Sequence, residues 1–387
     1  MNQPKLLQAP SPFYTAEHEE FRVQARRFVE RECVPHIDAW EQAGELPREL
    51  HRKAAAAGLL GVGFPEEYGG IEVPDPYYGV ILTEELARTG SGGLIASLMS
   101  HSIASPPIVH AGTPEQKARF LAPVLAGEKI AALAITEPGG GSDVASLRTT
   151  ARREGGYYLV SGSKTFITSG MRADLVTVAV RTGEAGLGGI SLLVIEAGTQ
   201  GFTRSKLDKM GWWCSDTATL YFDGCQVPAE NLIGKENAGF MAIMHNFNNE
   251  RIMLAAQAWA FAKVCYEEAL AYARERQTFG KPLIARQAIR HKLVDMKMRI
   301  DAVKAQLDVL CWRVSHKQMP VAEVCLLKNL ATGTLEDCAS EAVQILGGAG
   351  YLRGAKVERF FRETKVLSIG GGASEIMKDL AARQLGY

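Results

Sequence analysis

The residues best placed to do chemistry lie at 247–251, which read FNNER and come directly before a long apolar run at 252–272. The two asparagines are favourable helix N-caps, so the sequence predicts a helix that begins here and ends near Arg276. A helix with so little polar surface is buried, and it carries the carboxylate of Glu250 into or beside a core. That carboxylate could accept a proton from a ligand, or it could stabilise the helix N-terminus and pair with Arg251. Residue type alone favours the second interpretation.

Three other polar segments could bind a ligand. Residues 134–143 read AITEPGGGSD, where a hydroxyl, a turn and backbone N–H groups freed by glycine would form a cradle for a ring carbonyl or a phosphate. Taken alone, this segment could equally be a tight loop at the start of a strand. Residues 164–168 read KTFIT, and a ring and a hydroxyl two residues apart lie on one side of a strand. Residues 276–281 read RQTFGK, which places a guanidinium at a helix end, where it suits a diphosphate.

Several common motifs are absent or lack their context. Ser161 and Lys164 fit the S-x-x-K pattern, but that acylase chemistry needs the serine at a helix start, and here it lies between strands. No G-x-G-x-x-G follows a strand and no Walker A motif occurs, so neither nucleotide-binding device is supported. The seven cysteines are scattered without a C-x-x-C pair, which predicts reduced thiols and no metal.

Charge and length set further bounds. The chain has 43 Lys+Arg against 43 Asp+Glu, which gives no electrostatic case for nucleic acid or an anionic membrane as partner. The first residues lack an apolar export segment, and no run of 18 apolar residues occurs, so we expect a cytoplasmic protein with no membrane insertion. At 387 residues, the chain should form two or three domains.

The predicted elements indicate a mostly helical α+β protein. Helical patterns begin after Thr15, a plausible N-cap, and recur around 47–58, 76–89 and 114–126, before short β-type runs at 157–160, 175–180, 190–195 and 217–222. The last third is helical again, with a third long helix at about 320–346. The second helix of this last third, which precedes that one, has an apolar seam typical of a helical bundle at Ile289, Leu293, Met296, Ile300, Val303, Leu307, Leu310 and Val314.

The polar segments, together with residues 344–351 (QILGGAGY) and 372–376 (GASEI), resemble the acyl-CoA dehydrogenase family of flavoproteins. The resemblance covers essentially the whole chain and rests on five motifs in the family's order. It implies an N-terminal helical domain at 1–129, a middle β-barrel domain at 130–239 and a C-terminal four-helix bundle at 240–387. It also implies FAD as cofactor and a homotetramer built as a dimer of dimers.

Carried over position by position, the resemblance implies which residues touch FAD and the acyl-CoA. The segments 133–136 and 166–168 would contact the isoalloxazine ring, and a neighbouring subunit would hold the diphosphate and adenine end. The implied FAD contacts are Leu133, Ile135, Thr136, Ser142, Phe166, Thr168, Arg276, Phe279, Gln287, Gln344, Gly348, Ala373 and Glu375. The implied acyl-CoA contacts are Ser142, Asn248, Arg251, Gly370 and Gly371.

One departure from the family pattern concerns the catalytic base. Many members carry Tyr-Glu-Gly-Thr at the end of the bundle, where the Glu is the base, but this chain has Gly371 at that position. Either α-proton abstraction has been lost, or the chain resembles the long-chain and isovaleryl branches, whose base directly precedes an arginine at the start of the first bundle helix. Glu250-Arg251 fits the second pattern, so we expect Glu250 to be the base.

The resemblance implies a mechanism for these residues. Glu250 would take the α-proton of a thioester while the β-hydrogen leaves as hydride to flavin N5, with Thr168 as a partner of that nitrogen. The enolate oxygen would be stabilised by the backbone N–H of Gly371 and a ribityl hydroxyl of the flavin. We expect an apolar pocket to raise the pKa of Glu250 once substrate expels water. The electrons would pass to an electron-transfer flavoprotein.

The same glycines suggest a substrate class. Gly370 and Gly371 stand where many relatives carry Tyr and Glu, so we expect an unfilled apolar volume beside the reacting bond. Such a volume favours long straight chains, or methyl-branched isoprenoid-like acyl-CoAs such as citronellyl-CoA, over butyryl-CoA. Two alternatives are a flavoprotein of this fold with desulfinating or oxygen-using chemistry, and a binding subunit with a disabled site.

Overall fold

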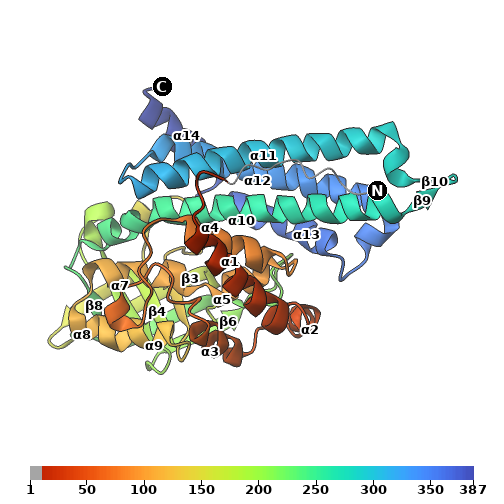
Figure 1. Cartoon of the computed structure of the whole chain (residues 1–387). Helices are drawn as coiled ribbons and strands as arrows, with labels where there is room; N and C mark the ends of the chain where they lie inside the picture. The colour runs from red at the N-terminus through yellow and green to blue at the C-terminus, as the bar shows by residue number, and fades with distance from the viewer. Residues whose placement is uncertain (1–10) are drawn as a thin grey trace.

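The computed structural model describes residues 11–387, apart from the side chains of His245 and Asn246. Long helices form a bundle along one side of the molecule, and the N-terminal helices and a β domain pack together beneath it (Figure 1). The largest apolar core joins the N-terminal helices to the bundle, and a second core lies inside the β domain.

The N-terminal part is a set of mostly short helices. In order these are α1 (Ala16–Phe28), α2 (Ile37–Ala43), α3 (Arg48–Ala56), α4 (Tyr77–Ala87), α5 (Gly92–Leu98), α6 (His101–Ala104), α7 (Pro106–Ala111), α8 (Pro114–Gln116) and α9 (Ala122–Leu125). The predicted N-cap is confirmed, because the side chain of Thr15 accepts a hydrogen bond from the His18 N–H at the start of α1.

The middle part is one eight-stranded sheet. Its strands are β1 (Ala131–Ala134), β2 (Thr150–Glu154), β3 (Tyr157–Thr168), β4 (Leu175–Arg181), β5 (Ile190–Glu196), β6 (Phe202–Lys206), β7 (Thr217–Pro228) and β8 (Leu232–Ile233). The hydrogen-bonded order is β6-β7-β3-β2-β4-β5-β8, with β1 added in parallel beside β4. The longest pair, β3 with β7, is antiparallel and is interrupted between Lys164 and Ile167 by a shift of register.

The C-terminal part is the predicted helical bundle. It consists of α10 (Gly239–Glu275), α11 (Gln287–Ser315), α12 (Val321–Leu346), α13 (Lys356–Ile369) and α14 (Ser374–Leu385). A small hairpin, β9 (Gln277–Thr278) with β10 (Lys281–Pro282), turns the chain from α10 into α11, and the 3₁₀ helix η8 (Gly347–Tyr351) follows α12. The predicted seam of α11 is confirmed, since its central members from Leu293 to Leu310 are buried and its two end members pack against the core.

The start of the long helix differs from the prediction. Helix α10 begins at Gly239, so 248–249 lie inside it and do not cap it. The preceding segment 239–247 reads GFMAIMHNF and is mostly apolar. It is helical because its side chains Phe240, Ala242 and Ile243 pack on the core between the β domain and the helix. Tertiary packing therefore overrides the local N-cap signal.

No described helix of residues 11–387 is long and apolar enough to cross a membrane. All seven cysteines are free and buried. The domain boundaries at 129 and 239 stay predictions, although β1 begins at Ala131 and α10 at Gly239.

The packing of α10 against α13 gives a stability prediction. The rings of Phe261 and Phe360 are fully buried and stack with their centroids 4.3 Å apart. We expect Phe360→Ala to lower the free energy of unfolding by about 3–5 kcal/mol, because it leaves a cavity between two long helices. The neighbouring Phe361 is 47 % exposed, so Phe361→Ala should change it by less than about 1 kcal/mol in chemical unfolding experiments. Equal losses for both variants would contradict this account.

Candidate active site

Glu250 lies about three turns inside α10, too far from the helix start to stabilise its N-terminus. This excludes the interpretation that the carboxylate stabilises the helix N-terminus. The side chain points at the turn between α13 and α14, where a Cβ placed on Gly371 would lie 3.7 Å from Oε1 of Glu250. Burial raises the pKa of Glu250 to about 7, against the opposing charges of Arg251 and then Lys328. A carboxyl with this pKa can accept a proton near neutral pH.

The turn at Gly370–Gly372 faces this carboxylate with its backbone. Gly371 has φ +64° and Gly372 has φ +105°, conformations that favour glycine. The Nε of Arg251 donates a hydrogen bond to the carbonyl of Gly371 (3.2 Å), while its Nη1 donates to Oδ1 of Asn248 (3.3 Å). Within residues 11–387, the N–H of Gly371 donates no hydrogen bond. It is a backbone donor available to a ligand beside Glu250.

The expected open volume beside Gly371 is filled. A Cβ on Gly371 would come within 2.4 Å of Cδ1 of Leu254, one turn after Glu250 on α10, and a Cβ on Gly372 would come within 2.4 Å of the Cε of Met377. The prediction of an unfilled space at this glycine is therefore wrong. The side chain of Leu254 occupies the place that a side chain at 371 would need, as close packing favours.

The two segments predicted to contact the isoalloxazine lie side by side. The N–H of Thr165 donates to the carbonyl of Thr136 (2.9 Å), which ties residues 133–136 to the end of β3. Phe166 is 70 % exposed and has φ +61°, because the register shift between β3 and β7 falls here. The regular alternation assumed for residues 166 and 168 does not apply across this bulge. Thr168 is half-buried, and Ser142 lies exposed in the glycine loop.

A buried lysine shapes this region, and the prediction missed its role. Lys164 is fully buried, and its Nζ donates to the carbonyl of Ile135 (2.9 Å) and to Oε1 of Glu137 (2.8 Å). Glu137 in turn accepts from the N–H of Thr149 (2.9 Å), so the loop at 137–149 is tied back to the sheet. Burial lowers the pKa of Lys164 to about 8, opposed by Glu137. A charged residue inside the β-type segment KTFIT was the available signal.

Five other predicted FAD residues lie at the other end of the bundle, where β9 and β10 join α10 to α11 and where α12 ends (Figure 1). Arg276 directly follows α10, and it stands about 39 Å along the helix axis from Glu250, farther than one FAD molecule can reach. These distant residues, Arg276, Phe279, Gln287, Gln344 and Gly348, are all exposed. A Cβ at Gly347 or Gly348 would meet nothing within 4 Å. An exposed guanidinium is a group suited to a diphosphate.

Ala373 and Glu375 lie at the start of α14, near the glycine turn. Ala373 is half-buried and is the N-cap of the helix, and Glu375 is exposed in its first turn. The structure therefore divides the predicted residues into three groups: the β-domain segments, the glycine turn with α10 and α14, and the far end of the bundle.

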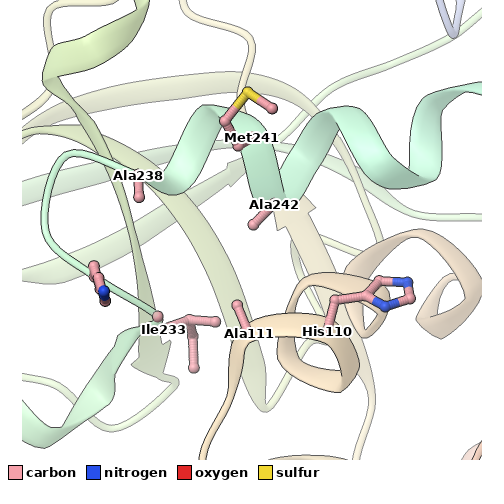
Figure 2. Close-up of a pocket in the computed structure, with 8 residues that line it drawn as sticks. His110, Ala111, Ile233, Ala238, Met241 and Ala242 are labelled. Atoms are coloured by element: carbon pink, nitrogen blue, oxygen red, sulfur yellow. The ribbon is translucent and has the colours of Figure 1, made fainter.

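Two cavities of the described chain are lined by none of the predicted residues. One, of about 350 Å³, lies at the first turn of α10, where Ala238 and Ala242 face Ala111 and Ile233 (Figure 2). The other, of about 680 Å³, lies among basic and acidic side chains near Trp213. Neither cavity includes Glu250 or Gly371.

Lys328 is the second residue that sequence reasoning missed. It is fully buried on α12, and its Nζ donates a hydrogen bond to the carbonyl of Gly372 (2.7 Å). The signal was a lysine on an apolar helix face, in the run Val324-Cys325-Leu326-Leu327-Lys328.

Comparison with known proteins agrees with the arrangement. Three family models match in order: the acyl-CoA dehydrogenase N-terminal domain at 15–128, the middle domain at 132–225 and the C-terminal domain at 237–386. The long-chain specific acyl-CoA dehydrogenase of Rattus norvegicus is 38 % identical, with 96 % of this chain and 87 % of that protein covered.

Solved structures give the same result. An acyl-CoA dehydrogenase from Geobacillus kaustophilus has a TM-score of 0.94 and 38 % identity, and the match covers 97 % of this chain and 100 % of that one. A glutaryl-CoA dehydrogenase from Mycobacterium smegmatis, in complex with FADH2, has a TM-score of 0.90 and 25 % identity over 96 % of this chain and 95 % of that one. The chain belongs to the acyl-CoA dehydrogenase family, whose members are FAD-dependent oxidoreductases.

Proposed function

We propose that this chain oxidises an acyl-CoA to the trans-2-enoyl-CoA and that Glu250 is the catalytic base. The observation that carries the proposal is the position of the Glu250 carboxylate beside Gly371, whose N–H is free in the described chain. Removal of a proton next to a carbonyl requires a base for the proton and a hydrogen-bond donor for the carbonyl oxygen, close to each other. The Glu250 carboxylate and the Gly371 N–H meet this requirement. The Cβ–Cα bond of the substrate would lie between them.

The side chains divide the work as follows. Glu250, in its ionised form, takes the α-proton, and the Gly371 N–H donates to the thioester oxygen as negative charge develops there. Arg251 is buried and holds the Gly371 carbonyl, so it orients the turn and remains close enough to favour the ionised form of Glu250. Bound FAD supplies the acceptor for the hydride that leaves the β-carbon. The resemblance assigns Asn248, Ser142 and Gly370 to acyl-CoA contacts.

We propose that the β-domain segments hold the isoalloxazine. Leu133 lies in β1, and Ile135 and Thr136 directly follow it. The hydrogen bond from the Thr165 N–H to the Thr136 carbonyl fixes this strand end beside Phe166 and Thr168. The hydroxyls of Thr136, Thr168 and Ser142 and the backbone of the glycine loop supply hydrogen-bonding groups suited to a flavin ring and phosphate. Ala373 and Glu375 would contact the same cofactor from the start of α14.

We also propose a homotetramer, a dimer of dimers. The distance between Glu250 and Arg276 supports it, because the two groups of flavin residues can serve one FAD only if they come from two copies. Apolar side chains exposed on the bundle surface support it as well: Val294, Met298 and Val309 on α11, and Leu326 and Leu330 on α12.

For the substrate we propose a long-chain acyl-CoA, with electron-transfer flavoprotein as the electron acceptor. A long-chain relative that matches over nearly the whole chain supports this choice. The branched, citronellyl-type alternative loses the support of an open volume at Gly371, because Leu254 fills that place. The cytoplasmic location stays a prediction.

The test of the function is Glu250→Gln. This variant keeps the size and hydrogen bonding of the side chain but removes the proton acceptor, so we expect at least about a 1,000-fold slower reduction of bound flavin by acyl-CoA, with acyl-CoA still bound. The pKa of Glu250 is raised to about 7, so the wild-type rate should be full above that pH and fall as pH drops through it. Anaerobic stopped-flow absorbance measures both effects.

The matched control is Glu267→Gln, an exposed carboxylate on the same helix, which should leave the rate and its pH dependence unchanged. If Glu250→Gln reduces its flavin at the wild-type rate, Glu250 is not the base. If the wild type reduces no flavin with any acyl-CoA, the desulfinating, oxygen-using or disabled-site alternatives gain support.

The shared flavin site predicts that Arg276→Ala loses flavin and weakens the oligomer together. A charge-assisted contact of this type contributes about 1.5–3 kcal/mol. Size-exclusion chromatography with absorbance detection on dilution measures both quantities in one run. The control is Arg274→Ala, another exposed arginine in the last turn of α10. Retention of flavin and assembly by Arg276→Ala would place Arg276 outside the site.

Because Leu254 fills the space at Gly371, we expect that shortening this side chain changes the preference between straight and branched acyl chains. In the wild type, kcat/KM should rise from butyryl-CoA to long straight chains and should be lower for 3-methyl-branched chains. Leu254→Ala removes the side chain that occupies the glycine side, so kcat/KM for a 3-methyl-branched chain should improve relative to the straight chain by about 4-fold per accommodated methyl group. A wild-type optimum at four carbons would contradict the long-chain proposal, and an unchanged ratio in Leu254→Ala would show that this space is not beside the reacting bond.

A further inference from the structure

We propose that Lys328 is a positioning residue for this reaction: it fixes the Gly370–Gly372 turn and so places the Gly371 N–H opposite Glu250. The inference rests on the proposed function and extends it to a residue on a third helix. Lys328 would not touch the substrate, because its Nζ is engaged by the protein backbone.

Lys328 and Glu250 converge on the same glycine from two helices. A Cβ on Gly371 would lie 3.8 Å from the Cε of Lys328 on α12 and 3.7 Å from Oε1 of Glu250 on α10. The Nζ of Lys328 donates to the carbonyl of Gly372 at 2.7 Å. The lysine therefore reaches past the glycine that supplies the free N–H and holds the residue after it.

The peptide groups on both sides of the Gly371 amide are anchored. Before it, the N–H of Gly370 donates to the carbonyl of Val366 at the end of α13 (2.8 Å). After it, the carbonyl of Gly371 accepts from Arg251 and that of Gly372 accepts from Lys328. Three successive glycines have great conformational freedom, so without these anchors the direction of the Gly371 N–H would not be fixed. A hydrogen-bond donor that already points at the substrate oxygen before the reaction begins stabilises the negative charge that develops on that oxygen.

The cost of burying Lys328 indicates a role beyond folding. Its side chain is fully buried, and it forms no ion pair within 4.0 Å among residues 11–387. Burial and the like charge of Arg251 lower the pKa of Lys328 to about 8, while Glu250 opposes them. An apolar residue would pack here without this desolvation cost.

Lys328 also acts on Glu250 through its charge. The charged groups that act on Glu250 are Arg251, its neighbour on α10, and Lys328 from α12; Cys325 of α12 is a titratable thiol beside both cations. Loss of the lysine charge should therefore raise the pKa of Glu250 further. Because Glu250 acts in its ionised form, the acidic limb of the pH–rate profile should then move to higher pH.

The competing explanation is that Lys328 only attaches α14 to α12. The next residue offers a matched control, because Nδ2 of Asn329 donates to the carbonyl of Ser374 (3.0 Å) in the same segment. Asn329→Leu removes an attachment of similar geometry without removing a charge near Glu250. A purely structural role predicts that variants at 328 and 329 behave alike.

The experiment compares the holoenzyme of the wild type, Lys328→Met, Lys328→Gln and Asn329→Leu. Flavin reduction by a saturated acyl-CoA is measured over pH values on both sides of about 7. Independently of turnover, difference infrared spectroscopy measures the thioester carbonyl stretch of a bound, isotopically labelled acyl-CoA analogue that cannot be oxidised. The melting temperature and flavin content report on folding.

For Lys328→Met we expect kcat/KM to fall by roughly 10- to 100-fold, mostly through kcat, because a misplaced donor costs up to about that factor. The acidic limb should move to higher pH, and the carbonyl stretch should shift toward that of the free ligand. Lys328→Gln keeps a donor but not the charge, so its stretch should remain nearer the wild type while its acidic limb still moves. Asn329→Leu should change neither.

The inference is overturned if Lys328→Met and Lys328→Gln keep the wild-type pH limb and carbonyl stretch, or if Asn329→Leu shifts both equally. If Lys328→Met does not fold, Lys328→Gln alone decides through its pH limb. A failure of the proposed function gives a different result: Glu250→Gln retains the wild-type rate, or no acyl-CoA reduces the wild-type flavin. The carbonyl stretch still tests Lys328 in that case, because it needs binding and no turnover.

Discussion

The site depends on the burial of helix α10 between the bundle and the rest of the molecule. From Ile252 to Ala273 its side chains are mostly buried, and they belong to the largest core of the protein. A helix packed on several sides can neither rotate about its axis nor slide along it. The carboxylate of Glu250 is therefore positioned by contacts far from the substrate. The glycine turn comes to this carboxylate because α12 and α13 pack on the same helix. The chemistry is thus placed by apolar packing, and polar contacts then refine it.

Much of the architecture could be predicted because its signals are local or repeated. The seam from Ile289 to Val314 predicts a bundle helix from spacing alone. The four β-type runs predict β3, β4, β5 and β7, although β3 and β7 extend well beyond them, and they miss β1, β2, β6 and β8. The start of α10 could not be predicted, since asparagine is a good N-cap and only the core around Phe240 shows that the helix starts earlier. The bulge at Phe166 depends on the partner strand β7, which local sequence does not reveal.

The sequence predicted those parts of the candidate site that depend on an unusual residue type in its surroundings. It did not predict which side chain fills the space beside a glycine. Glu250 stood out because a carboxylate heads an apolar run, and family resemblance then decided between its two roles. The filled space at Gly371 was predicted wrongly, because an absent side chain says nothing about which neighbour takes its place. Lys164 and Lys328 were visible as lysines in apolar surroundings, but each donates to a backbone carbonyl, which carries no sequence signal, and Lys164 donates to Glu137 as well.

The left-handed conformation of Gly371 and its contact with Leu254 bear on how the base could change place within this family. Returning a carboxylate to position 371 would require an L-residue at φ +64° and the removal of the leucine side chain that stands 2.4 Å from its Cβ. A single substitution at position 371 would therefore encounter both the unfavourable backbone conformation and the clash with Leu254. Transfer of the base from α10 to the turn between α13 and α14 is therefore an evolutionary path of at least two coupled changes, in which position 254 must make room before position 371 can gain a side chain.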